Sequence, residues 1–223
     1  MAETTSTRPT LALLKRVLPD LLRRAFRQWR HTDSAARGTL MRLWIGRQFR
    51  NPDPVLPLGL APAPRVLFVC HGNILRSAVA EAFYQQACRG GLAPAGSRAE
   101  SAGVNAINGR PADPRGIRVA TEFGLALTDH RARRLTGVML DASDLVLVMD
   151  RVNEAEVVAR FPAHAAKVRR LGGLGTTPPT SAGPDIADPF LGDEEGVRHA
   201  FAQVGVAVRA LSAFLSKSRA PSN

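Results

Sequence analysis

The chain has 223 residues, 45% of them apolar, and a formal net charge of +11, so it is long enough to bury one core of roughly 150 residues with something smaller beside it. Its two cysteines, Cys70 and Cys88, are too few for a disulfide framework and lack metal-binding spacing, which favours a reducing compartment and predicts no metal or cofactor. No apolar run approaches the ~20 residues of a membrane span, and the run Leu11 to Leu14 is too short for a signal peptide, so we expect a cytoplasmic chain that spans no membrane.

The first 60 residues differ from the rest in charge and pattern. They hold 11 Lys and Arg against 4 Asp and Glu. Apolar residues recur at helical spacing from Leu11 to Trp29 with basic residues largely on the other side, which predicts a basic amphipathic helix, bent near Pro19. A weaker helix is predicted around Met41 to Phe49. Five prolines between Asn51 and Pro64 favour an extended linker, so we divide the chain into an extension, 1–60, and a folded domain, 61–223.

The basic face of the N-terminal helix has three possible roles. It could lie on an anionic membrane surface, which would make the protein peripherally membrane-associated, or dock to an acidic partner. It could equally be a solvated face over a small packed extension. No nucleic acid is expected as a partner, because the basic residues form one helical face without a recognisable binding motif.

From Arg65 onward, strands and helices alternate. Strand patterns cover 65–69, 144–149 and, as a possibility, 167–171, while helical patterns cover 77–88, 113–123 and 153–161. A last helix carries one apolar stripe over 197–215. The segment 172–189 has no regular period and reads as a long, functional or disordered loop. This alternation predicts an α/β fold with a parallel sheet covered on both faces.

The stretch from Val69 to Ser77, between the first strand and its helix, carries the chemistry. Successive backbone N–H groups in such a loop converge on one point, and the helix N-terminus adds positive charge there, so the loop suits a tetrahedral oxyanion. Cys70, at the strand end facing Arg76, is expected to be a thiolate at neutral pH that attacks phosphorus and forms a phosphocysteine. Arg76 would hold two equatorial oxygens, and Ser77 could donate its hydroxyl to the departing sulfur.

A cysteine, five residues and an arginine occur often by chance, and Cys70 could instead be a small buried hydrophobe at a strand end. The surrounding strand, turn and helix start favour the catalytic interpretation. The stretch resembles the phosphate loop of the low-molecular-weight protein tyrosine phosphatases, and the resemblance extends over about residues 65 to 216. It includes Ser77–Glu81, Ser101–Gly103, Gly109–Pro114, His130–Leu135 and Asp188–Phe190.

The resemblance implies a three-layer α/β fold, with a four-stranded parallel sheet, helices on both faces and the phosphate loop after the first strand. It implies that Asp188, fixed by Pro189, is the general acid, with Asp185 as its nearest competitor. Asn73, Ser101 and His130 would brace the loop. The phosphate would be bound by His71, Gly72, Asn73, Ile74, Leu75, Arg76 and Ser77, and the aromatic ring of the substrate would be flanked by Ile107 and Phe190.

Several residues depart from the pattern of this family or distinguish the chain from proteins of the same fold with other functions. Many members have a second cysteine where this chain has Leu75, so we expect no disulfide within the loop. An arsenate reductase would need two further cysteines after Cys88, and none exists. A protein arginine phosphatase carries threonine where this chain has Ile74, and a phosphate-binding regulatory module would not need Cys70 and Asp188 together. The stretch 105–109 lacks an aromatic residue, as in bacterial members that act on tyrosine autokinases of polysaccharide export.

Overall fold

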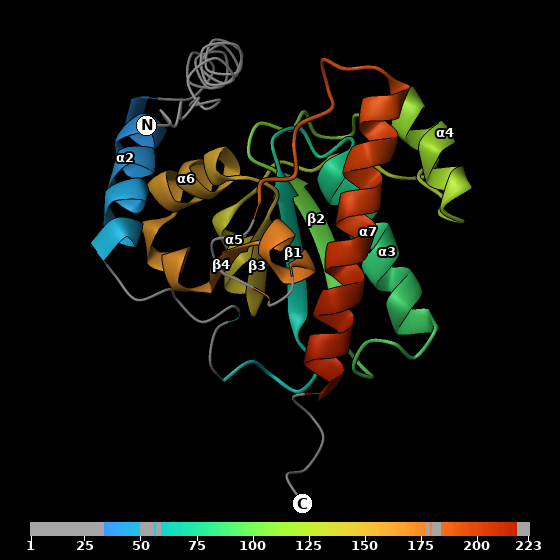
Figure 1. Ribbon diagram of the computed structural model, residues 1–223, viewed down its shortest axis with the longest axis horizontal. Coiled ribbons are helices and arrows are strands. Elements are labelled where there is room, and N and C mark those ends of the chain that lie inside the picture. Colours follow the sequence, from blue (N-terminus) through green and yellow to red (C-terminus); the bar gives the residue numbers. More distant parts are fainter. Residues whose placement is uncertain (1–33, 50–55, 57–58, 177–178, 180–183, 218–223) are drawn as a thin grey trace, which may run out of the picture.

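The computed structural model describes residues 34–49, 56, 59–176, 179 and 184–217. The predicted amphipathic helix over Leu11 to Trp29 and nearly all of the proline-rich linker lie outside these residues. The weaker predicted helix is present and starts earlier, as α2 (Ser34–Phe49). It lies against α6 (Arg151–Arg160), as Figure 1 shows, and its Ala36 is buried.

Four parallel strands form one sheet in the order β2-β1-β3-β4. They are β1 (Arg65–Cys70), β2 (Arg98–Gly103), β3 (Leu145–Val148) and β4 (Val168–Arg170). The two central strands are buried on both faces, which explains why each reads as a continuous apolar run. The expectation of a parallel sheet is therefore confirmed, and Ser101–Gly103 does end the second strand.

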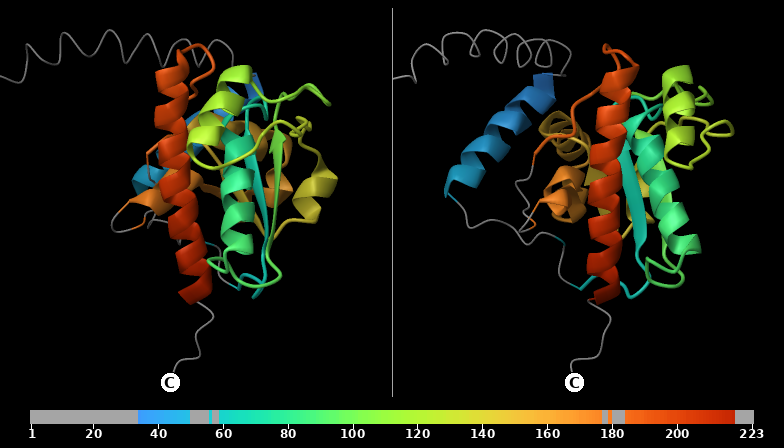
Figure 2. Two further views of the ribbon diagram at one scale, coloured as in Figure 1. Left: turned by 90° about the vertical axis from the view of Figure 1, so that its right-hand side faces the viewer. Right: turned by 45° about the vertical axis from the view of Figure 1, so that its right-hand side comes forward.

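Helices cover both faces of the sheet, which confirms the three predicted layers (Figures 1 and 2). On one face, α3 (Arg76–Arg89), α4 (Pro114–Glu122) and α7 (Glu194–Lys217) pack against Phe68 and Leu147. On the other face, α5 (Gly137–Asp141) and α6 pack against Leu67 and Val146. The helix α7 is long and apolar enough to span a bilayer, but half of its apolar window is buried in the protein, as in a core helix.

The long segment after β4 contains structure that the sequence pattern does not predict. A 3-10 helix, η2 (Leu171–Gly175), begins it and packs on α7, whereas the sequence indicates only a loop there. Gly172 allows Pro184 to lie against this 3-10 helix, because a Cβ at that position would lie 2.1 Å from the Pro184 carbonyl oxygen. A second short element, η1 (Pro162–Lys167), precedes β4. Residues 184–190 lie at the carboxyl end of the sheet, where the Ile186 N–H donates to the Met149 carbonyl oxygen.

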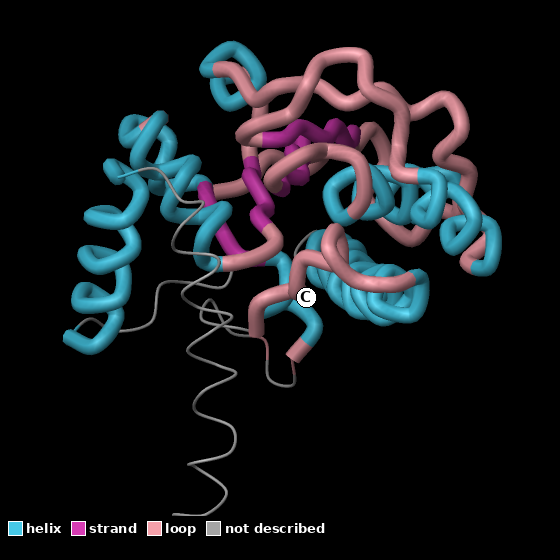
Figure 3. The backbone as a smooth tube through the Cα atoms, turned by 90° about the horizontal axis from the view of Figure 1, so that it is seen from above, coloured by secondary structure: helices cyan, strands magenta, loops and turns pink. Residues whose placement is uncertain are grey.

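The topology predicts where a ligand binds. The chain passes from β1 to β2 on one side and returns to β3 on the other, so β1 and β3 flank a switch point in strand order. In open α/β sheets the crevice beyond the carboxyl ends of such strands is the usual binding site. Figure 3 looks onto the molecule from above, where loops gather over the sheet. The segment from Cys70 to Arg76 lies at this edge.

Candidate active site

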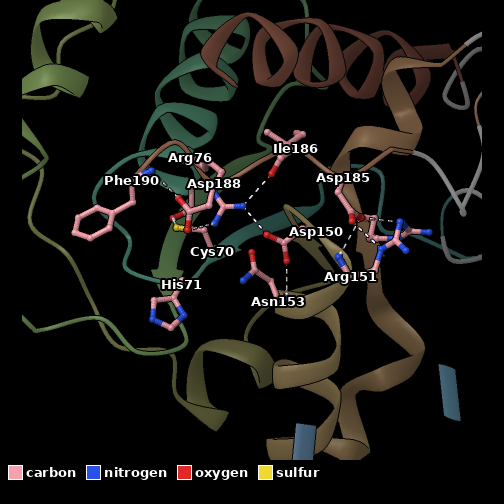
Figure 4. Close-up of polar contacts among 12 residues, drawn as sticks. Cys70, His71, Arg76, Asp150, Arg151, Asn153, Asp185, Ile186, Asp188 and Phe190 are labelled. Atoms are coloured by element: carbon pink, nitrogen blue, oxygen red, sulfur yellow. Dashed lines mark hydrogen bonds and ion pairs between the residues drawn. The ribbon is translucent and has the colours of Figure 1, made fainter. Parts of the chain in front are cut away.

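The loop between β1 and α3 folds around the sulfur of Cys70. The Sγ atom lies 2.9 Å from Oγ of Ser77 and accepts a hydrogen bond from the backbone N–H of Asn73 at 3.2 Å. Cys70 is buried at the base of a pocket of about 220 Å³, whose lining also includes Arg76 and Asp188. Figure 4 shows these side chains converging. The pocket is smaller than typical sites for drug-sized ligands and suits one phosphate ester.

Asn73 holds the loop in shape from its centre. Its φ angle of 54° lies in the left-handed region, which asparagine tolerates better than most residues. Its side-chain amide donates to the hydroxyls of Ser77 and Ser101, both at 2.9 Å, and its Oδ1 accepts from the backbone N–H of Arg133 at 2.8 Å. Nε2 of His130 lies 2.7 Å from the Asn73 carbonyl oxygen. The structure thus brings the three expected bracing residues together at the loop.

Two further contacts fix the support behind the loop. The Ser101 hydroxyl donates to Oε2 of Glu81 at 2.5 Å, so Ser101 is itself held in orientation. At Gly103 a Cβ would lie 2.7 Å from the His71 carbonyl oxygen and 2.8 Å from the Asn73 nitrogen. Only glycine lets the end of β2 approach the loop backbone this closely.

Arg76 lies beneath the pocket and is held on three sides. Its side chain is 2% exposed, and its Nη1 donates to Oδ2 of Asp150 at 2.6 Å and to the Ile186 carbonyl oxygen at 2.9 Å. Its Nη2 lies 2.7 Å from Oδ2 of Asp188. Burial works against the charged guanidinium, but Asp150, Asp188 and Cys70 outweigh it and raise the Arg76 pKa above its ordinary value. Arg76 is therefore a fixed, fully charged cation.

The two candidate acids of the loop 184–190 occupy different places. Asp185 is tied down by Arg151, through Nε at 2.7 Å, and by Arg170, through Nη1 at 3.0 Å, and it does not line the pocket. The Ile186 N–H donates to the Met149 carbonyl oxygen at 2.9 Å, which anchors the next residue to β3. Asp188 follows and reaches the pocket, with its side chain 39% exposed. The anchoring of Asp185 and Ile186 thus positions Asp188.

Ile107 and Phe190 stand at the pocket mouth. Both line the pocket, and both are exposed, Ile107 to 63% and Phe190 to 43%. They come from different loops, so together they frame an opening with apolar surface on two sides. Arg115 secures the second loop by donating to the carbonyl oxygens of Phe190, at 3.1 Å, and Gly192.

The sequence interpretation missed Asp150, which the structure places against Arg76. Asp150 lies two residues after β3 and also caps α6, where its Oδ1 accepts from the Asn153 N–H at 2.7 Å. A signal existed: a carboxylate that follows a buried strand lies at the carboxyl edge of a parallel sheet, where the site forms.

Replacing Asp150 by asparagine is expected to lower the free energy of unfolding by about 3 kcal/mol. Asparagine caps a helix as well as aspartate does, so the loss reports the ion pair with buried Arg76 rather than the end of α6. Urea unfolding of the two proteins measures it. The exposed Asp129 supplies the control, since Asp129→Asn removes the same charge. Equal stability of the two variants would show that Asp150 does not hold Arg76.

His71 forms a second pair that the sequence interpretation missed. Its Nδ1 lies 3.8 Å from Oε2 of Glu156, a residue of α6 whose side chain is 1% exposed, and 3.4 Å from the side-chain nitrogen of Asn105. The nearby carboxylate of Glu156 raises the His71 pKa above 6.5 and prevails over burial, with Asp188 adding to the rise and Arg76 opposing it.

This pair should make stability depend on pH. Because the His71 pKa is higher in the folded state, its contribution is fully present below the unfolded value of about 6.5 and is lost as pH rises through the folded value. The difference in unfolding free energy between the wild type and His71→Gln should therefore shrink from pH 6 to higher pH. Urea titrations across this range measure it, and a difference that grows with pH would contradict the pairing.

Oxidised Cys70 should not be protected by a disulfide. Leu75 occupies the position of the second loop cysteine, and Cys88 lies eleven residues beyond Ser77 on α3, about 16 Å away at 1.5 Å per residue. We expect peroxide to drive Cys70 up the oxidation ladder, without recovery through an intramolecular bridge. Mass spectrometry after peroxide treatment tests this. A Cys70–Cys88 disulfide whose reduction by dithiothreitol restores activity would refute it.

Comparisons with known proteins agree with this geometry. A family model described as low molecular weight phosphotyrosine protein phosphatase matches residues 65–220. The probable low molecular weight protein-tyrosine-phosphatase EpsP of Ralstonia nicotianae is 38% identical over 125 residues, which cover 56% of this chain and 77% of that protein. Low molecular weight protein-tyrosine phosphatase A of Mycobacterium tuberculosis is 38% identical over 148 residues, 66% of this chain and 88% of that one.

Solved structures share the fold over the same region. The tyrosine phosphatase Wzb from Escherichia coli K30, in complex with sulphate, superimposes with a TM-score of 0.60 at 27% identity and covers 68% of this chain and 98% of its own. The YwlE arginine phosphatase from Geobacillus stearothermophilus gives a TM-score of 0.62 at 30% identity, covering 70% and 95%. Together with the family match, these similarities show that the chain belongs to the low-molecular-weight phosphotyrosine protein phosphatases.

Proposed function

We propose that this phosphatase hydrolyses phosphotyrosine in proteins with Cys70 as nucleophile, Arg76 as phosphate clamp and Asp188 as general acid. One observation carries the proposal: the sulfur of Cys70, the guanidinium of Arg76 and the carboxylate of Asp188 line a single pocket at the carboxyl edge of the sheet. A nucleophile, a phosphate clamp and a proton donor in one pocket are the groups that hydrolysis through a phosphocysteine requires.

In the first step, the Cys70 sulfur attacks phosphorus, an S–P bond forms and the bond from phosphorus to the tyrosine oxygen breaks. Asp188 gives its proton to that oxygen, so a neutral phenol leaves. Asp150 and Ile186 occupy Nη1 of Arg76, so the phosphate would bind along the Nε and Nη2 edge, where it displaces the Asp188 carboxylate from Nη2. The backbone N–H groups of residues 71–76 bind the remaining charge.

In the second step, water attacks the phosphocysteine while Asp188 accepts its proton, and the S–P bond breaks to release phosphate. The leaving sulfur carries negative charge, and Ser77 is placed to stabilise it at 2.9 Å. The Ser77 oxygen accepts a hydrogen bond from Asn73, and its own proton can go to the sulfur at 2.9 Å or to the more distant Ala102 carbonyl oxygen at 3.3 Å. Ser77 thus acts on the leaving group of this step.

The pocket lining supports an aromatic ester as substrate. Ile74 and Leu75 lie in its wall and are nearly fully buried, and Ile107 and Phe190 frame its mouth. Apolar side chains stabilise an aromatic ring better than they stabilise a charged guanidinium. This supports phosphotyrosine over phosphoarginine, although YwlE, named as an arginine phosphatase, shares the fold.

The test compares phosphate release from two otherwise identical peptides, one with phosphotyrosine and one with phosphoarginine. We expect kcat/KM to favour phosphotyrosine, and Ile74→Thr to shift the ratio toward phosphoarginine. A wild-type preference for phosphoarginine would replace the proposed activity with the alternative. Tight binding of both peptides without phosphate release would indicate a regulatory phosphate-binding module instead.

The physiological substrate we propose is a bacterial tyrosine autokinase of polysaccharide export. The support is the stretch Asn105–Gly109, which lacks an aromatic residue. Phosphate should be released faster from the tyrosine-phosphorylated tail of such a kinase than from free phosphotyrosine. Equal rates of phosphate release from the kinase tail and from free phosphotyrosine would contradict this substrate assignment.

We further propose that the protein is cytoplasmic, and that its extension, 1–60, brings the phosphatase domain, 61–223, to an anionic membrane surface or an acidic partner. The support is the excess of basic residues in that extension. Because α2 lies against α6, a truncation that starts at Ser34 removes the predicted amphipathic helix while keeping this contact. Co-sedimentation with anionic liposomes should be stronger for the full chain than for the truncated one. Equal sedimentation would contradict the membrane role.

A further inference from the structure

One wall of the pocket carries positive charge that the proposed chemistry does not use. His71, Asn105, Ile107 and Arg110 line this wall, and a backbone hydrogen bond from Asn105 to the His71 carbonyl oxygen, at 2.9 Å, joins its two segments. The other side of the mouth comes from a different loop and carries Asp188 and Phe190. Arg110 is exposed, so its guanidinium faces the solvent in which a substrate approaches.

Arg110 differs from the arginines near it in the fold. Arg115 binds Asp113 through both carboxylate oxygens, Arg133 binds Glu100, and Arg134 donates to the Ala106 carbonyl oxygen. Within the described part of the chain, no carboxylate lies within 4.0 Å of the Arg110 guanidinium, and its side chain makes no hydrogen bond. The charge of Arg110 helps to lower the Asp113 pKa, but the Asp113 carboxylate is ion-paired with Arg115.

The guanidinium of Arg110 therefore lies at the mouth of the pocket, where a phosphotyrosine would enter, without a carboxylate partner among the described residues. His71 lies on the same wall, 3.8 Å from the carboxylate of Glu156, which favours the charged form of the imidazole. The carboxylate of Asp188 is neutralised by Arg76 at 2.7 Å. When a peptide binds through its phosphotyrosine, residues next to the phosphotyrosine can lie against this wall. There Arg110 would attract a carboxylate of the peptide and repel a lysine.

We propose that Arg110 binds an acidic side chain next to the phosphotyrosine, so that the phosphatase selects acidic phosphopeptide segments. This inference rests on the proposed phosphotyrosine activity and adds a determinant of specificity to it. Arg110 would touch the peptide away from phosphorus, and its contact would be the same in the ground state and the transition state. Its effect should thus appear mainly in KM rather than kcat.

The test uses two phosphotyrosine peptides of equal length, one with glutamate on both sides of the phosphotyrosine and one with glutamine. For the wild type we expect kcat/KM to be about three- to fivefold higher for the glutamate peptide, the range of a solvent-exposed ion pair, and the ratio to fall at high salt. Arg110→Gln should bring the ratio close to one. Arg110→Glu should invert the preference and favour a third peptide with lysine on both sides.

The matched control is Arg98→Gln, which removes the same charge at the exposed start of β2, at the opposite end of that strand from Ser101 and Gly103. It should keep the wild-type ratio. A ratio of one in the wild type, or an equal loss in Arg98→Gln and Arg110→Gln, would overturn the assignment of Arg110 while leaving the activity standing. Failure to hydrolyse any of the three peptides would instead reject the phosphotyrosine activity itself.

Discussion

Replacing Cys70 by serine should lower kcat for phosphotyrosine hydrolysis by at least about a thousandfold. Serine keeps the size of the side chain at a buried position, so the loop should fold as before. Its hydroxyl is a far weaker nucleophile at neutral pH than a cysteine thiolate, and no phosphoenzyme should form. Rapid-quench mass spectrometry would detect the phosphocysteine in the wild type and show whether the variant lacks it.

Cys88→Ser is the matched control, because it removes the other thiol of the chain at the far end of α3. We expect its kcat to match the wild type. Cys70 is the single remaining thiol of this variant, so its treatment with iodoacetate reports on Cys70 alone. Alkylation of Cys70 should abolish turnover. Substantial hydrolysis by the Cys70→Ser protein, with phosphate bound to no residue during turnover, would show that water attacks the substrate directly.

The chemistry around Cys70 was readable from the sequence because it is local. A buried strand, an oxyanion-binding loop and a helix start follow one another within residues 65 to 77, and each has its own pattern. The predicted start of the helix, Ser77, differs from the observed Arg76 by one residue. The short helix α5 was missed because five residues are fewer than the periodicity of a helix requires for detection.

The residues that contact the phosphate loop from other elements were harder to predict from the sequence. Asp150 and Glu156 reach the site from the end of β3 and from α6, and they meet Arg76 and His71 because β3 lies next to β1. The order of strands in a sheet is a long-range property that no single segment encodes. Asp185 shows the same limit, since only its contacts with Arg151 and Arg170 separate it from the proposed acid.

Replacing Asp188 by asparagine should lower kcat for phosphotyrosine by about 10²- to 10⁴-fold, the usual contribution of a positioned general acid. Asparagine keeps the shape of the side chain but cannot deliver a proton to the phenol oxygen. The loss should be much smaller for p-nitrophenyl phosphate, whose leaving group is stable without a proton. The pH profiles of kcat for both esters, in the wild type and the variant, measure this difference.

The same substitution should strengthen the binding of oxyanions. The Asp188 carboxylate lies 2.7 Å from Nη2 of Arg76, so it competes with phosphate for that donor and repels its charge. Asp188→Asn should therefore lower the inhibition constant of inorganic phosphate while kcat falls. Asp129→Asn, which removes an exposed carboxylate outside the pocket, should not change the response to the leaving group. If Asp188→Asn slowed both esters equally and weakened phosphate binding, Asp188 would be a structural brace for Arg76 and the proton would have to come from another group.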